Sequence, residues 1–118
     1  MSFAETLKDL LVRIRGAEML MICGIDGMPV EQTGATAIAA PEDLNAETSQ
    51  LMRNISDACE SLELGTAAEV MFKTEKCTVV LSAITPEYYF AAVLRPSGNV
   101  GQARFLLKST AASIAHEF

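Results

Sequence analysis

The sequence predicts an α/β (α+β) domain with the element order α-ββ-α-βββ-α, in which helices cover both faces of a single antiparallel sheet. Two patterns predict it. Short apolar runs bounded by Gly, Pro or Asp fall into two groups, and the short turns within each group favour antiparallel pairing. Before, between and after these groups, apolar residues recur every three or four positions, as in amphipathic helices. The chain has 118 residues and half are apolar. Residues 1–118 are therefore predicted to form one domain.

The first element is predicted to be a helix from Phe3 to Arg15. Ser2 suits its N-cap and Glu5 the third helical position, which together make a capping box. Gly16 can end the helix in the left-handed conformation. The apolar residues at helical spacing are Phe3, Leu7, Leu10, Leu11 and Ile14.

A β-hairpin follows, with strands Met19–Cys23 and Pro29–Thr33. Asp26-Gly27 predicts a tight type I′ turn, because both central residues of that turn need a positive φ. Pro29 lacks an N–H group and is tolerated in a sheet only at an edge. The second strand is therefore expected to be an edge strand.

A long helix is predicted to begin at Pro41 and to stop at Gly65. Its expected core stripe consists of Leu44, Leu51, Ile55, Ala58 and Leu62. Its far face is polar and carries Ser49, Arg53, Asp57 and Glu60. A flank beside the stripe is apolar or small and carries Met52, Ser56 and Cys59.

The second half predicts three strands, Ala67–Lys73, Cys77–Ala83 and Tyr88–Leu94, and a helix over Asn99–Ala115. The hairpin can join this meander through either its first or its last strand. In the order 2-1-5-4-3 the strand Ala67–Lys73 becomes the second edge. That strand contains Val70, Met71 and Phe72 and no proline. An apolar edge without protection favours pairing with another chain.

Composition excludes several function classes. The net charge is −6 and the nine basic residues are spread thinly, which argues against nucleic acid as a partner. No apolar run approaches the roughly 18 residues of a membrane span, and the N-terminus lacks a signal-peptide pattern. Three widely spaced cysteines without a CxxC pair are typical of a reducing compartment. A cytoplasmic location is therefore expected, without membrane association.

Catalytic and ligand-binding motifs are not found. The single histidine, His116, lies two residues from the end of the sequence, and the cysteines fall in apolar patterns. No ligands recur at metal-site spacing, and Gly24–Gly27 lacks the GxGxxG pattern and precedes a strand. The prediction is a protein that is not an enzyme and has no catalytic residue, cofactor or metal.

Two segments resemble the roadblock/dynein light-chain domain family. The run from Ile22 to Val30, ICGIDGMPV, is similar to the first hairpin of that family, where an apolar strand ends in a G-x-D-G turn. The run from Asn99 to Leu107, NVGQARFLL, is similar to the N-x-G-x-x-R-x-x-L start of its last helix. The element order matches as well, so the likeness extends over almost the whole chain.

The resemblance implies a sheet in the order 2-1-5-4-3, with the second helix on one face and the other two helices on the opposite face. It also implies a homodimer, or a heterodimer with a paralogous roadblock protein, in which third strands pair and second helices lie side by side. The interface would then contain the strand residues Val70, Met71 and Phe72 and the helix residues Met52, Ser56 and Cys59. The family contains scaffolds and regulators of small Ras-like GTPases, including GTPase-activating partners of the bacterial gliding-motility type.

The leading hypothesis is accordingly a dimeric regulator or scaffold that binds a small Ras-like GTPase through Ser49, Arg53, Asp57 and Glu60. Two alternatives remain open. A small-molecule sensor would use a pocket between the sheet and the helices, since the interior is rich in Met and small residues. A structural dimerisation module would leave GTP turnover unchanged.

Overall fold

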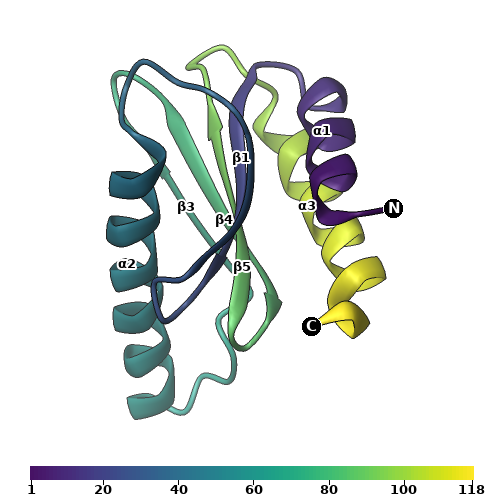
Figure 1. Ribbon diagram of the computed structural model, residues 1–118. Coiled ribbons are helices and arrows are strands. Elements are labelled where there is room, and N and C mark those ends of the chain that lie inside the picture. Colours follow the sequence, from purple (N-terminus) through teal and green to yellow (C-terminus); the bar gives the residue numbers. More distant parts are fainter.

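The computed structural model describes all 118 residues and has the predicted order of elements (Figure 1). Several ends differ from prediction by a few residues: α1 lies at Phe3–Arg13, β1 at Ala17–Gly24, β2 at Pro29–Gly34, α2 at Pro41–Ser61, β3 at Glu69–Lys73, β4 at Thr78–Thr85, β5 at Tyr88–Leu94 and α3 at Val100–Ile114, followed by a short 3₁₀ turn at Ala115–Glu117.

The five strands form one antiparallel sheet in the order β2-β1-β5-β4-β3. The hairpin therefore joins the meander through its last strand, β5, whose apolar side chains are buried on both faces as a central strand requires. Helix α2 covers one face, and α1 and α3 cover the other, which confirms the predicted layers (Figure 1). Strands β2 and β3 are the two edges, so Pro29 does mark an edge strand.

The two faces of the sheet carry cores of different size. The core under α1 and α3 contains 15 buried residues, whereas the core on the α2 side contains ten. Only one of those ten, Met52, comes from α2 itself. Apolar burial drives packing at about 25 cal/mol per Å², so α2 depends less on it than the other helices do.

The hairpin turn differs from the predicted type. The Gly24 N–H donates to the Met28 carbonyl at 2.8 Å, which leaves a loop of three residues, Ile25 to Gly27, and the Gly27 N–H donates to the Gly24 carbonyl at 3.0 Å. Gly27 has φ +94°, but Asp26 does not have a positive φ. The prediction of a two-residue type I′ turn is therefore wrong. The loop is a turn closed by one left-handed glycine, which requires positive φ at a single position.

The end of α2 is also placed differently. The Glu63 N–H donates to the Glu60 carbonyl and the Leu64 N–H to the Cys59 carbonyl, so the chain leaves the helix in a Schellman motif. Glu63 occupies its left-handed position with φ +54°, where Gly is normally found. Gly65, predicted to stop the helix, follows two residues later.

Two loops at one end of the sheet are held together through Gly16. Its carbonyl accepts the Arg95 N–H at 2.8 Å, and the neighbouring Arg15 carbonyl accepts the Asn99 N–H at 2.8 Å. Gly16 has φ +86°, and a Cβ atom there would lie 2.4 Å from the Cα of Gly98. Only glycine satisfies both the conformation and the close approach.

We expect Gly16→Ala to lower the free energy of unfolding by at least about 2 kcal/mol, since a left-handed alanine alone costs roughly 1–2 kcal/mol before the clash is counted. Gly101→Ala is the matched control, because its Cβ would meet nothing closer than 3.7 Å in the first turn of α3. That control should be neutral or slightly stabilising. Urea titration of both variants measures the difference, and equal losses would contradict the role of the Gly16–Gly98 contact.

Candidate protein-interaction surface

Helix α2 faces the sheet with a different stripe from the predicted one. Its buried residues are Asn45, Thr48, Ser49 and Met52. The stripe predicted as core, Leu44, Leu51, Ile55, Ala58 and Leu62, instead lies along one side of the helix; its N-terminal leucines are partly buried, and Leu62 is 66% exposed. The prediction of the core stripe is wrong because polar side chains, bonded to partners in other elements, hold the helix in this rotation.

Three hydrogen bonds fasten α2 to the rest of the chain. Asn45 Nδ2 donates to the Gly27 carbonyl at 2.6 Å, and Arg53 Nη1 donates to the Ile25 carbonyl at 2.6 Å, both in the β1–β2 hairpin. Thr48 Oγ1 lies 2.8 Å from the Tyr89 hydroxyl in β5. Because Thr48 gives its only proton to the Leu44 carbonyl at 2.7 Å, Tyr89 is the donor in that contact.

The four residues predicted to bind a partner do not all share one exposed face. Ser49 is 1% exposed and donates to the Ala46 carbonyl at 3.1 Å, so its predicted exposure is wrong. Arg53 is half-buried because it holds the hairpin. Asp57 and Glu60 are exposed, as expected.

The helix residues predicted for a dimer interface also lie on the side of α2 that faces the sheet. Met52 is 3% exposed and belongs to the core between α2 and the sheet. Ser56 and Cys59 are partly buried on the same side of the helix and line a cleft. Sequence reasoning missed Asn45 and Thr48 on this side. The available signal was a stripe without charged residues: Asn45, Thr48, Ser49, Met52, Ser56 and Cys59.

A second apolar side of α2, which we call the α2 flank, is formed by Leu51, Ile55, Ala58 and Leu62; the first two are partly buried and the last two are exposed. At 100° per residue this flank is roughly half a turn around the helix from Arg53, which contacts the hairpin. It therefore points away from β1 and β2. Leu51 at its start packs against the α2-side core cluster, as Val70 of β3 also does.

Strand β3 presents an open edge. Val70 is partly buried against the α2-side core, and the exposed residues include Met71 and Phe72, which is 38% exposed. The Thr74 N–H donates to the Cys77 carbonyl and the Ala83 N–H to the Ala68 carbonyl. Since hydrogen-bonded pairs alternate along an antiparallel ladder, the backbone groups of Glu69, Met71 and Lys73 point outward.

The opposite edge is protected. Pro29 begins β2 without an N–H group, and the Gln32 N–H donates to the Glu31 carboxylate at 3.2 Å. The register of β1 with β2 places the Gln32 backbone on the outer side of that ladder. A side chain of the same strand thus occupies a donor that a further strand would need. The two edges differ in their availability for pairing.

The charges of the helices also differ. Helix α2 carries five carboxylates and one arginine, whereas α3 carries Arg104 and Lys108 and no carboxylate. Arg104 pairs with Glu69 of β3, on the face opposite α2. The outward face of α2 is therefore acidic. Its exposed carboxylates include Asp57 and Glu60.

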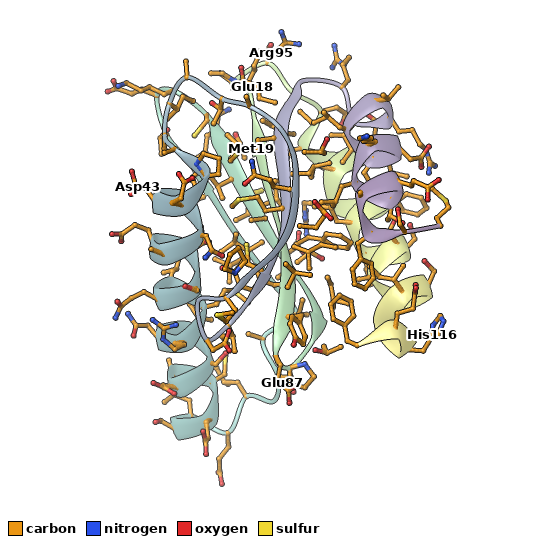
Figure 2. The ribbon with its side chains drawn as sticks, viewed as in Figure 1. Glu18, Met19, Asp43, Glu87, Arg95 and His116 are labelled. Carbon is orange, nitrogen blue, oxygen red and sulfur yellow. The ribbon has the colours of Figure 1, made fainter.

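Groups capable of chemistry are dispersed. His116 is exposed at the far end of the chain, on the α3 side of the sheet (Figure 2). No group of three or more His, Cys, Asp or Glu side chains is placed to hold a metal ion. None of the helices combines the length and the hydropathy that crossing a bilayer requires.

A cleft of about 400 Å³ lies between the C-terminal half of α2 and the ends of the strands. Buried Met52 and Tyr89 line it together with the partly buried Ser56, Cys59 and Tyr88. Burial raises the pKa of Tyr89, and the hydrogen bond with Thr48 opposes this by a smaller amount. Burial also raises the pKa of the neighbouring Cys23 thiol to about 11. The hydrogen bond with Tyr89 opposes this rise by a smaller amount.

A family model of the Roadblock/LC7 domain matches residues 3–94. Among solved structures, MglC from Myxococcus xanthus has 28% sequence identity and a TM-score of 0.69, and the match covers 100% of both chains. A Roadblock/LC7 domain from Streptomyces avermitilis has 13% identity and a TM-score of 0.87, over 99% of this chain and 98% of that one. The gliding protein MglB from Thermus thermophilus has 14% identity and a TM-score of 0.81, over 95% of this chain and 84% of that one. These last two likenesses concern the fold alone. Comparison with curated proteins finds no match.

The raised pKa values predict a loss of stability in alkali. Burial favours the neutral forms of Cys23 and Tyr89, so the folded-state pKa of each exceeds its unfolded value. The contribution of these two groups to the free energy of unfolding is complete below about pH 8.5. It is lost as the pH rises, by about 1.4 kcal/mol per pH unit for each titrating group. Chemical denaturation between pH 8 and 11 measures this slope. The Cys23→Ala/Tyr89→Phe double variant should lose most of it, and an unchanged slope in that variant would refute the assignment.

Proposed function

The chain belongs to the Roadblock/LC7 family, and from this premise we propose that it is a dimeric regulatory protein that binds a small Ras-like GTPase. The observation that carries the proposal is the open β3 edge with its exposed apolar residues Met71 and Phe72, to which the apolar α2 flank adds. The sequence similarity to MglC supports a regulator of the type that the family resemblance implies. The proposed partner copy is this chain itself or a paralogous roadblock protein.

The sequence of β3, EVMFK, is self-complementary when two copies pair antiparallel about Met71. Glu69 of one copy then lies opposite Lys73 of the other, twice, on the α3 face. Val70 lies opposite Phe72, also twice, on the α2 face. Opposite charges and apolar pairs across neighbouring strands each stabilise a sheet by roughly 0.2–1 kcal/mol. The outward-facing backbone groups of Glu69, Met71 and Lys73 supply the hydrogen bonds.

The same pairing brings two α2 flanks towards one another on one face of the joined sheet. Leu51, Ile55, Ala58 and Leu62 would be covered there. The acidic outward faces of both helices, with Asp57 and Glu60, stay accessible to a client. Charge complementarity then favours a basic surface on the GTPase. Ser49 is buried and therefore does not belong to the proposed client surface. Arg53 holds the hairpin, so its proposed role is to position that surface.

Phe72→Asp should convert the dimer to a monomer, because two carboxylates would be buried without partners in the paired edge. Phe105→Asp is the matched control: Phe105 is 71% exposed on α3 and lies outside the proposed interface. Analytical ultracentrifugation over a concentration series distinguishes the two variants. Lys73→Glu tests the register, since it places like charges opposite each other. A Phe72→Asp protein that remains dimeric would contradict this edge pairing.

Binding to the small Ras-like GTPases of the same genome tests the functional proposal. We expect binding to depend on the bound nucleotide and Asp57→Lys to weaken it about tenfold or more, through like-charge repulsion at the interface. Glu117→Lys, on an exposed residue of the 3₁₀ turn, should leave binding unchanged. Measuring GTP turnover with the same proteins separates an activator from a scaffold or a structural dimerisation module. If none of the GTPases binds in either nucleotide state, the proposal is wrong.

A further inference from the structure

The cleft beside the C-terminal end of α2 has walls that hydrogen bonds fix in place. The Ile25 N–H at the hairpin tip donates to the Glu87 carbonyl in the β4–β5 turn at 2.8 Å. The Ile25 carbonyl accepts the Arg53 guanidinium of α2 at 2.6 Å. Three segments are thus joined around one opening of about 400 Å³ (Glu87 is labelled in Figure 2). Its volume lies within the range of small-ligand sites, which begins at about 300 Å³.

The lining separates into an apolar floor and an acidic rim. Met52 and Tyr89 are buried at the floor, and Ile25 and Tyr88 are partly buried beside them. The only charged residues of the lining are Glu60 and Glu63, both exposed. No Lys, Arg or His is among the lining residues, and the Arg53 guanidinium is engaged by the Ile25 carbonyl.

The end of α2 adds to this negative charge. The last carbonyl groups of a helix carry a partial negative charge, which basic side chains in the last turn commonly offset. The last turn of α2 has no basic residue. Glu63 follows it in the left-handed conformation and also lines the cleft. The carboxylates and the helix end therefore act on the cleft with the same sign.

These groups select one class of ligand. The acidic rim disfavours anions such as phosphate, and a simple divalent metal would find only two carboxylates among the lining residues. A guanidinium or ammonium group pairs with carboxylates, and an alkyl stem packs on an apolar floor. Aromatic faces such as those of the two tyrosines further attract cations.

We propose that this cleft binds a guanidinium or ammonium group carried on an alkyl stem. The group comes either from a free small cation or from an arginine or lysine side chain of a protein partner. The inference gives chemical content to ligand sensing and does not depend on the GTPase proposal, because cation binding is measured without a GTPase; only Glu60 belongs to both surfaces.

Calorimetry and amide NMR titration of the full chain with agmatine, and with a capped Gly-Arg-Gly peptide, test the inference. The matching capped peptide with citrulline in place of arginine is the uncharged control. We expect saturable binding of at least one cation, shifts concentrated at Thr85 and Tyr88, and no binding of the citrulline peptide. Agmatine binding without peptide binding identifies a free cation as the source, whereas peptide binding identifies a side chain.

Matched variants locate the site. Glu60→Gln/Glu63→Gln should weaken binding tenfold or more, while Glu47→Gln, which removes an exposed α2 carboxylate outside the lining, should not change it. Ala67→Leu fills the opening without changing charge and should also abolish binding. Circular dichroism checks that each variant is folded. Failure of both cations to bind, equal binding of the citrulline peptide, or an equal loss in Glu47→Gln would overturn the proposal.

Discussion

The polar fastening of α2 to the sheet determines what the rest of the surface offers. Asn45 and Arg53 hold the β1–β2 hairpin through its carbonyl groups, and Thr48 holds β5 through Tyr89. Leaving a buried polar group without a partner costs free energy, so these bonds fix the rotation of the helix about its axis. Rotation by a third of a turn would bury the leucines and leave these donors unpaired. The apolar flank is therefore only partly buried, because the polar stripe faces the sheet.

The asymmetry between the two sheet edges follows from single residues. Pro29 and the Glu31 carboxylate remove or occupy donors of β2, while β3 retains its outward groups and an apolar surface. An exposed apolar edge is an aggregation hazard in a monomer. Its retention in a chain that protects its other edge is understandable if β3 is normally covered. In the proposed dimer the two α2 flanks meet beside the paired edges, so one partner copy covers both.

Much of the fold was predictable from the sequence because its signals are local, whereas the rotation of α2 was not. Breakers such as Gly16 and Pro41 delimit the elements, and Pro29 marks one edge. Periodicity, however, reports only which helix face is most apolar, and in α2 that face carries the leucines. The partners that bury the other face lie 18, 28 and 41 residues away in sequence, so no local pattern contains them. The sequence therefore predicts surface positions for Ser49 and Met52, whereas both are buried in the structure.

One helix thus carries three separate stripes, and their separation has a functional consequence. In the proposed function the α2 flank meets a second copy and the acidic outward face meets a client, while the sheet-facing stripe closes the cleft. Glu60 belongs to both the outward face and the rim of the cleft, whereas Asp57 belongs to the outward face alone. A cation held at Glu60 would neutralise part of the surface that a basic client needs. Occupation of the cleft and binding of the client are therefore expected to oppose each other through this single carboxylate.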